Sequence, residues 1–329
     1  MSQGELAFGL GETSPPHARP SDWPAADHRR FFIEFLTAVR RVGSATPHLY
    51  MVAAAARQSP NPAQWVAGYG ATYTFPGAEL LTRCPDGIAA ALAWVTAHWD
   101  YVPLRRERRA VRAPQRFAQC YVGLVRWATT FAIRTPAWWA AGDYEAAWAE
   151  VTALPYIGRY MAIRLLQLVH VLYGWPATMP DLRARGAQYP RQALALLRPD
   201  EAPCLLGGDD RATVARAEAV SAEVLADLRT EVPGLSFYEL QSLSCEYKQS
   251  VLGEKQYPGR SVDSELRHFA TASAAGSPLD PAASVFGAVR RALYPTWALG
   301  ELSGWTDSRD ECGRVLADHR YTWSDAQYD

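Results

Sequence analysis

Residues 153–168 read Ala153-Leu-Pro-Tyr-Ile-Gly-Arg-Tyr-Met-Ala-Ile-Arg-Leu-Leu-Gln-Leu168, and they decide the fold expected for this chain. A helical pattern precedes them, the Leu-Pro pair ends it, and Gly158 begins a second helix. Ala162 is small at the point where two crossing helices would touch. The stretch therefore predicts two helices joined by a tight turn, within residues 143–173. An ordinary corner between two helices fits the same letters, so this stretch alone leaves both interpretations open.

A hairpin of this kind directs several backbone N–H groups and one helix N-terminus at a single spot. That arrangement suits a phosphate group of DNA, because the N–H groups donate hydrogen bonds and the helix dipole favours negative charge. We therefore expect Tyr156, Gly158 and Arg159 to contact the DNA backbone.

The rest of the chain is also helical in pattern. Before Gly43, apolar residues recur at spacings of three and four, which indicates an amphipathic helix: they are Phe31, Phe32, Phe35, Leu36 and Val39. Similar helices are expected at 86–99, 115–133, 143–152, 159–173, 188–197, 210–230, 236–249 and 281–302. Alternating strand patterns are nearly absent, so the predicted fold class is all-α.

The chain divides into three predicted parts. Residues 1–25 contain Pro and Gly without periodicity and are expected to form a disordered tail. Residues 26–200 are expected to form a helical domain that contains the hairpin, and residues 201–329 a helical C-terminal part packed on it. The segment Arg198–Asp210, rich in Pro, Gly and Asp, is the clearest candidate for a linker.

Composition narrows the class of protein. A chain of 329 residues that is 49% hydrophobic can bury a large core, and no run of about 20 apolar residues predicts a membrane span. The first residues show no secretory signal. The five cysteines are far apart and form no CxxC or Cys/His cluster, which argues against zinc, an iron–sulfur cluster or disulfides. We expect no metal or cofactor and a reducing cytoplasm.

Charge limits how the chain could bind DNA. The net charge is −1, so binding must come from a local patch. Six arginines within a dozen residues form one candidate: Arg105, Arg106, Arg108, Arg109, Arg112 and Arg116. A solvated helix face is the alternative. The only two lysines, Lys248 and Lys255, are close together. This indicates that the segment needs an ammonium group that arginine cannot replace, although chance clustering would give the same pattern.

The continuation of the hairpin carries a resemblance. After the second helix come Leu172-Tyr-Gly-Trp-Pro176 and then Asp181, 27 residues beyond Leu154. This order resembles the helix-hairpin-helix DNA glycosylase superfamily, whose catalytic aspartate follows the hairpin at a similar distance. The resemblance implies a glycosylase-like helical fold and a catalytic Asp181. An N-cap for the segment after Pro180 is the alternative for this aspartate.

Two residues depart from the superfamily pattern. Tyr156 replaces the first glycine of the hairpin, so we expect a rearranged approach to phosphate. Tyr160 stands where bifunctional glycosylases have a lysine, so a Schiff base with strand cleavage is not expected.

Two further segments, residues 65–81 and 244–266, carry a narrower likeness. They read Trp65-Val-Ala-Gly-Tyr-Gly-Ala-Thr-Tyr-Thr-Phe-Pro-Gly-Ala-Glu-Leu-Leu81 and Ser244-Cys-Glu-Tyr-Lys, continuing through Gln-Tyr-Pro-Gly-Arg260 to Leu266. Both are similar to the phage alpha-glutamyl/putrescinyl thymine pyrophosphorylases, or amino acid:DNA transferases. A related module accompanies hydroxymethyluracil DNA kinases, but no G-x-x-x-x-G-K-[ST] phosphate loop occurs in this chain.

The resemblance implies a hypermodification of thymine in double-stranded DNA, inside the bacterial host cell of a phage. An amino acid, with glycine expected first, or a polyamine would bond to the 5-methylene carbon of phosphorylated 5-hydroxymethyluracil. Phosphate or pyrophosphate would leave. A separate hydroxymethyluracil DNA kinase would supply the phosphorylated base, since the chain itself lacks the phosphate loop.

The chemistry assigns roles to residues in and near the matching motifs. A base that leaves the stack needs aromatic neighbours, and Tyr69, Tyr73 and Tyr160 are the candidates, with a core role as the alternative for each. The departing phosphate needs cations, and the candidates are Lys248, Arg260 and Arg164. The incoming amine must lose a proton, for which the possible bases are Asp181, Glu79 and Asp263. Cys245 could add to the ring, or it could be an inert buried thiol.

Two other functions stay open from the sequence. The hairpin and Asp181 alone fit a monofunctional DNA glycosylase, which would leave abasic sites. A noncatalytic DNA-binding protein would bind without changing the mass of any base.

Overall fold

The structure is a computed structural model that describes residues 23–41, 46–84, 86–133, 143–251, 265, 268–273 and 277–293. All regular secondary structure in these ranges is helical, which confirms the all-α prediction. Within them, no helix has both the length and the apolar character needed to cross a membrane. The predicted tail before residue 23, and the candidates Arg260 and Asp263, lie outside the described residues.

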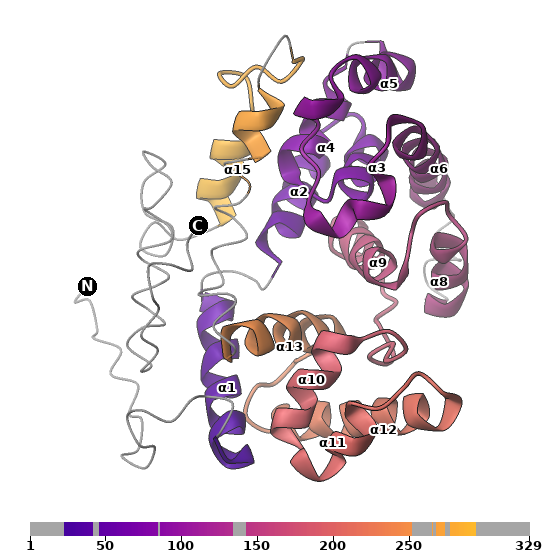
Figure 1. Ribbon diagram of the computed structural model, residues 1–329. Coiled ribbons are helices and arrows are strands. Elements are labelled where there is room, and N and C mark those ends of the chain that lie inside the picture. The colour runs from indigo at the N-terminus through magenta and orange to yellow at the C-terminus, as the bar shows by residue number, and fades with distance from the viewer. Residues whose placement is uncertain are drawn as a thin grey trace, which may run out of the picture.

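The helices gather around two apolar cores, which form the upper and lower halves of the molecule in Figure 1. The first core contains α2 (Pro47–Arg57), α3 (Pro62–Thr72), α4 (Phe75–Thr82), α5 (Gly87–Ala97), α6 (Pro114–Ile133), α8 (Tyr144–Thr152), α9 (Arg159–Tyr173) and α15 (Phe286–Leu293). The second contains α1 (Ala25–Arg41), α10 (Gln188–Leu197), α11 (Ala202–Leu205), α12 (Arg211–Leu228) and α13 (Phe237–Val251). Short 3-10 helices are η2 (Trp99–Tyr101), η3 (Arg106–Val111) and η4 (Pro199–Glu201).

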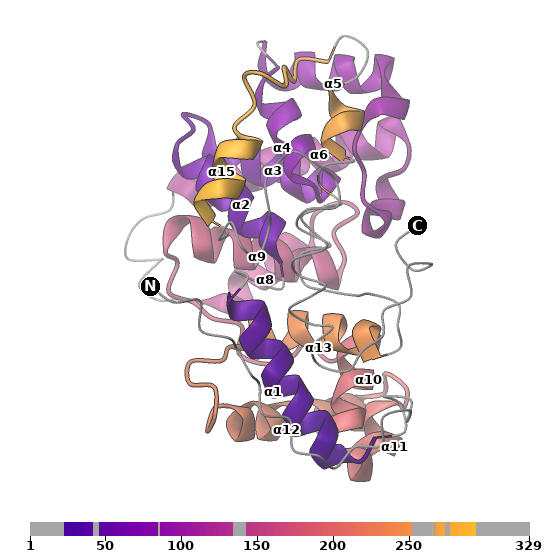
Figure 2. The ribbon, with the colours of Figure 1, turned by 90° about the vertical axis from the view of Figure 1, so that its left-hand side faces the viewer.

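The boundary between the cores differs from the predicted one at residue 200. Residues 174–187 join α9 to α10 and pass from the first core, which Met179 still lines, to the second, which Leu182 lines. Helix α1 belongs to the second core, although 26–200 was expected to form one domain. Its apolar face needs a partner, and α10 and α13 supply it, as Figure 2 shows for α1 lying along the lower half.

The contact between α1 and α13 includes a buried polar pair. His28 Nδ1 lies 2.9 Å from the hydroxyl of Tyr247, and the ring of Phe32 meets the same tyrosine edge-on at 5.1 Å. Residues more than 200 apart in the chain are thereby joined, so the second core closes only when both ends of this region are present.

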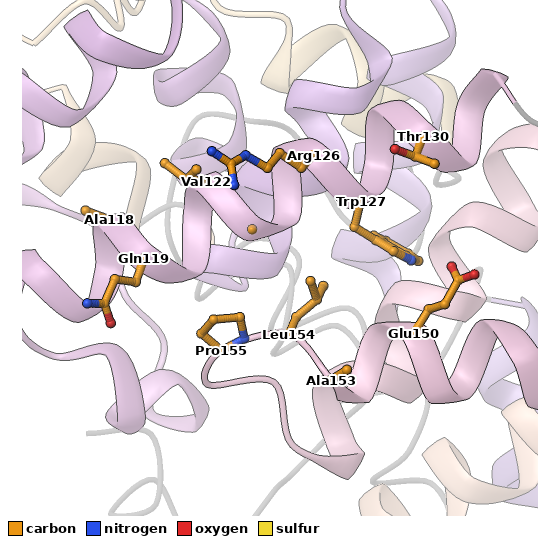
Figure 3. Close-up of a pocket in the computed structure, with 11 residues that line it drawn as sticks. Ala118, Gln119, Val122, Arg126, Trp127, Thr130, Glu150, Ala153, Leu154 and Pro155 are labelled. Carbon is orange, nitrogen blue, oxygen red and sulfur yellow. The ribbon is translucent and has the colours of Figure 1, made fainter.

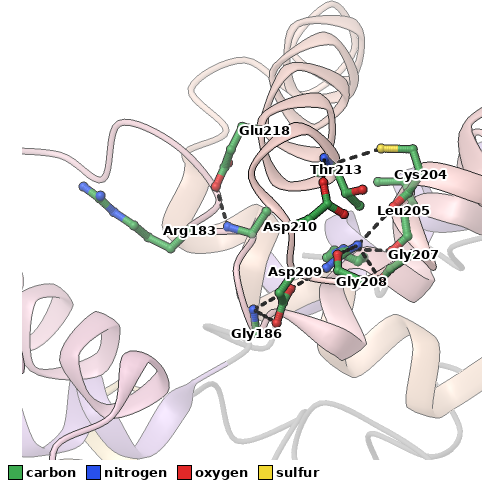
Figure 4. A network of polar contacts seen from close by, with 12 residues as sticks. Arg183, Gly186, Cys204, Leu205, Gly207, Gly208, Asp209, Asp210, Thr213 and Glu218 are labelled. Atoms are coloured by element: carbon green, nitrogen blue, oxygen red, sulfur yellow. Dashed lines mark hydrogen bonds and ion pairs between the residues drawn. The ribbon is translucent and has the colours of Figure 1, made fainter.

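The linker expected at Arg198–Asp210 is instead partly helical and fixed by hydrogen bonds, so that prediction is wrong. It forms η4 and α11, and the buried Arg191 donates to four of its carbonyl groups: those of Cys204, Leu205, Gly207 and Gly208. Arg191 also pairs at 2.9 Å with Asp209, which lies beside Gly208 in Figure 4. One guanidinium can satisfy this many carbonyls because it carries five N–H donors.

Helix α3 lies at the centre of the first core. All its residues from Trp65 to Thr72 are buried, and α4 packs closely against it. A Cβ atom added at Gly68 would lie 2.8 Å from the Cα atom of Ala78, closer than real contacts allow. The absence of a side chain at this glycine therefore permits the close approach of α3 and α4.

We predict that Gly68→Ala lowers the free energy of unfolding by about 1–3 kcal/mol, because the new methyl group meets fixed backbone atoms of α4. Gly123→Ala in α6 is the matched control, since its Cβ would meet only ordinary contacts at 3.5 and 3.7 Å. This control should be neutral, or more stable by about 1 kcal/mol through its helix propensity. Denaturant unfolding of both variants measures the difference, and equal effects would contradict the close packing.

Candidate functional site at the junction of the two cores

Helices α8 and α9 form the predicted hairpin, joined by residues 153–158. Tyr156 in this turn has a φ of 61°, in the left-handed region that a residue with a Cβ atom rarely adopts. Gly158 precedes α9 as its N-cap and has an ordinary φ of −92°. Tyr156 therefore adopts a conformation that glycine adopts more readily than any other residue.

Two side chains hold Tyr156 in this conformation. The buried Arg108 donates from Nη1 to the carbonyl oxygen of Tyr156 at 3.2 Å, and from Nε to that of Ala71. The Tyr156 hydroxyl donates to Gln119 of α6 at 3.0 Å. The turn is thus fixed against both α3 and α6.

The arginine run divides into buried and exposed members. Arg108 is buried, and Arg105 pairs with the fully buried Glu265. Neither side chain is therefore available to bind DNA, contrary to the prediction for the arginine run. Arg109, Arg112 and Arg116 are exposed on η3 and the start of α6. The side chain of Arg106 lies outside the described part. Three exposed guanidinium groups therefore flank the segments that hold the hairpin turn.

The segment that carries Asp181 is tied to the start of α9. Arg159 donates from Nη2 to the carbonyl oxygen of Leu182 at 2.6 Å and from Nε to that of Arg183. Glu218 of α12 accepts hydrogen bonds from the N–H groups of Leu182 and Ala184 (Figure 4). Burial lowers the pKa of Arg159 to about 10, with Glu218 opposing the shift, so its guanidinium stays charged near neutral pH.

Asp181 is accessible and is not a helix cap. Its carboxylate accepts a hydrogen bond from the Arg183 N–H at 2.9 Å, a turn within a segment that has no helix until Gln188. Its side chain is 37% exposed. Arg183 Nε lies 3.3 Å away, and the guanidinium of Arg183 lies over the rings of Tyr144 and Trp148 at 5.0 and 4.8 Å. The N-cap alternative is therefore wrong, and a solvent-accessible carboxylate lies beside an aromatic surface.

Four of the residues predicted to bind substrate come together in one buried cluster beside α9. The hydroxyls of Tyr73 and Tyr160 lie 2.6 Å apart, and the guanidinium of Arg164 lies 4.9 Å from the centre of the Tyr160 ring. The ring of Tyr69 is 5.3 Å from that of Tyr73. Arg164 donates to Gln167 and, at 2.6 Å, to Ser242 of α13. We call Tyr69, Tyr73, Tyr160 and Arg164 the tyrosine–arginine cluster.

The other predicted catalytic residues lie elsewhere. Glu79 is fully buried, pairs with Arg83 at 2.8 Å, and accepts hydrogen bonds from Ser284 and Val285. These contacts give it a structural role in joining α4 to the start of α15. Lys248 Nζ lies 4.3 Å from the centre of the Tyr189 ring, and Cys245 is partly exposed on α13.

Glu265 is the buried charged residue that the sequence did not single out. Its Oε2 accepts a hydrogen bond from the Phe75 N–H at 2.6 Å, and its Oε1 accepts one from Arg105 Nε at 3.1 Å. Arg105 in turn lies over the ring of Tyr73 at 5.5 Å. Glu265 lies in the second of the two similar segments, residues 244–266, and this position could have identified it as a candidate. Glu265 thus holds Arg105 beside the ring of Tyr73 in the tyrosine–arginine cluster.

A groove of about 890 Å³ runs between α6 and the hairpin turn. Figure 3 shows Arg126 and Trp127 of α6 above Leu154 and Pro155 of the turn. Its lining is mostly apolar, with Arg126 and Glu150 as its charged members. DNA-binding surfaces are polar and positively charged, so this groove is not the expected path of DNA.

Comparison with protein-family models, with curated proteins and with solved structures gave no match to this chain. In the part that the structure describes, no group of three or more His, Cys, Asp or Glu residues could hold a metal ion. The site must therefore be interpreted from its own geometry.

The strain at Tyr156 can be measured with a pair of variants. Tyr156→Ala and Tyr156→Gly both lose the side chain, but only alanine keeps a Cβ atom at a φ of 61°. We expect the glycine variant to be more stable than the alanine variant by about 1 kcal/mol in equilibrium unfolding. At the exposed helical residue Ala149, glycine should instead be about 1 kcal/mol less stable than alanine. The same order at both positions would show that Tyr156 is unstrained.

Proposed function

We propose that this chain modifies thymine-derived bases in DNA by transferring an amine to phosphorylated 5-hydroxymethyluracil. The observation that carries the proposal is the position of the strained residues. Among the described residues, three that are not glycine have a positive φ: Tyr73, Tyr156 and Arg183. They lie in the tyrosine–arginine cluster, the hairpin turn and the Asp181 segment. Strained backbone persists only where surrounding contacts enforce it, and it concentrates at functional sites.

The proposed reaction is a substitution at the 5-methylene carbon of the base. The nitrogen of an amino acid or polyamine bonds to this carbon, and the carbon–oxygen bond breaks so that phosphate or pyrophosphate leaves with the bonding electrons. Asp181 accepts the proton that the amine loses, a role that its exposed carboxylate permits. Lys248 and Arg260 remain the candidates for binding the departing phosphate.

Two features support DNA as the substrate. The hairpin presents the N–H groups at the start of α9, with the exposed Gly158 before them, and both suit a phosphate. Arg109, Arg112 and Arg116 lie on segments adjoining those that hold Tyr156, so they extend positive charge beside the turn. Duplex DNA along this surface would bring one base near Asp181, once that base leaves the stack.

A monofunctional glycosylase is the second candidate, because an exposed aspartate after a hairpin could equally activate water. The two functions give different products from the same substrate. Transfer adds the mass of the amine to the nucleoside and needs phosphate made by a separate kinase. Hydrolysis releases free base and leaves an abasic site.

The test of the function is incubation of the protein with DNA carrying phosphorylated 5-hydroxymethyluracil and a mixture of amino acids and polyamines. Mass analysis of the nucleosides should show an amine adduct with release of phosphate or pyrophosphate, and unmodified DNA should give none. Abasic sites without an adduct would establish the glycosylase instead. Binding with no change of mass would establish a noncatalytic DNA-binding protein.

We predict that Asp181→Asn abolishes the adduct while DNA affinity stays within a few-fold, because an amide keeps the size but accepts no proton. Asp200→Asn is the matched control. Asp200 also pairs with a nearby arginine, Arg198, at 3.1 Å on the surface of the second core, and its variant should retain full activity. Full turnover by Asp181→Asn would remove this carboxylate from the mechanism.

Replacement of Arg109, Arg112 and Arg116 by glutamine should weaken the salt dependence of DNA binding. Each lost phosphate contact reduces the slope of log K against log salt by about 0.9 on duplex DNA. The control carries glutamine at Arg198, Arg211 and Arg216 on the second core, which changes the net charge equally. Equal slopes for the two triple variants would place the DNA path away from the hairpin.

A further inference from the structure

The tyrosine–arginine cluster contains two buried hydrogen-bond donors without a partner. In the described part of the chain, neither Arg164 Nε nor the Tyr69 hydroxyl has a hydrogen-bond partner. Arg164 is 2% exposed and Tyr69 is completely buried. Leaving a buried polar group unpaired costs about 1–3 kcal/mol, and more for a charged group, so two such donors in one cluster require an explanation.

The charge of Arg164 also lacks a carboxylate. Its hydrogen-bond partners Gln167 and Ser242 and the tyrosines around it are all uncharged. Burial opposes its charge, but a guanidinium keeps its proton in a protein, so Arg164 stays positively charged. Burial also raises the pKa of Tyr69 and of Tyr73, so both hydroxyls stay protonated. Arg164 therefore holds a positive charge that no described anion balances.

We propose that Arg164 and Tyr69 form a binding site for one small carboxylate. The Arg164 Nε–H and the Tyr69 hydroxyl supply two donors, which match the two oxygens of a carboxylate. The neighbouring cations already have anions: Arg105 pairs with Glu265, and Arg159 lies near Glu218 and Asp181. One unbalanced positive charge suits a group of charge −1, whereas a buried phosphate or pyrophosphate would bring excess negative charge.

The burial of the site limits the length of the ligand that it can hold. The residues of the cluster other than Tyr160 are nearly or completely buried, which excludes a long ligand. Ser242 of α13 accepts a hydrogen bond from Nη1 of Arg164 on α9, so α13 covers one side of the site. If the proposed transfer reaction holds, the ligand is the carboxylate of an amino acid donor, and a polyamine, which has no carboxylate, is excluded.

The experiment is calorimetric titration of the full chain, without DNA, with acetate, glycine and inorganic phosphate in turn. We expect acetate and glycine to bind at millimolar concentrations. Tyr69→Phe should weaken both about tenfold or more, through loss of a hydrogen bond to a charged group. Its unfolding temperature should be unchanged or higher, since the lost hydroxyl is buried without a partner.

Tyr121→Phe is the matched control, because Tyr121 is also fully buried with an unpartnered hydroxyl but lies outside the tyrosine–arginine cluster. Its affinity for carboxylates should stay within twofold of the unchanged protein. The proposal is overturned if no carboxylate binds, if phosphate binds more tightly than acetate, or if Tyr69→Phe binds normally. Because DNA is absent, failure of the transfer reaction leaves this result intact, and failure here leaves transfer from a polyamine possible.

Discussion

The arrangement of the candidate site depends on the two hydrogen bonds that Arg159 donates to the backbone carbonyls of Leu182 and Arg183. They join the first residue of α9 to the segment that leads from one core to the other. Arg183 adds a second link, because it pairs with Glu145 and lies over the rings of Tyr144 and Trp148 of α8. The guanidinium of Arg159 loses hydration, but the two carbonyl acceptors and the nearby Glu218 offset that loss. This residue was expected to contact DNA, and its observed contacts instead position the carboxylate.

A second arginine fixes the hairpin turn in the same way. Arg108 contacts the carbonyl of Tyr156 and is itself enclosed between α3 and α6, where its Nη2 donates to Cys120. The left-handed conformations of Tyr156 and Arg183 cost about 1–3 kcal/mol each, and the buried arginines hold the carbonyls at or beside these positions. The two turns are therefore rigid before any ligand arrives. Rigid turns suit a site that must distinguish one base from many.

The sequence predicted the amphipathic helices well, and helices α9 and α10 match their expected bounds. It missed α2, α3 and α4; in α3 and α4 the reason is that residues buried on every side show no helical periodicity. It also assigned the Gly- and Pro-rich residues 198–210 to a linker, since the clamp by Arg191 depends on contacts that no local pattern shows. For a related reason, all arginines of residues 105–116 were predicted to be exposed: the local sequence does not show that Arg108 is buried while Arg109 is exposed.

Whether a candidate residue joins the site depends on its neighbours in space. Resemblance grouped Tyr69, Tyr73, Tyr160 and Arg164 as substrate-binding, and the structure brings these four together. Glu79 was equally plausible from its motif, but its partners Ser284 and Val285, just before α15, lie about 200 residues away in the chain. Long-range pairs of this kind decide whether a carboxylate is structural or free, and they cannot be read from a single sequence.

The most direct test of the account is amide hydrogen exchange of the full chain with and without duplex DNA. DNA along the hairpin should slow exchange in residues 153–161 and 181–185 together, because Arg159 couples these two segments. Exchange in α12 beyond Glu218 should be unchanged. Protection confined to the second core, or protection of the hairpin with no effect at residues 181–185, would contradict a site shared between the hairpin and Asp181.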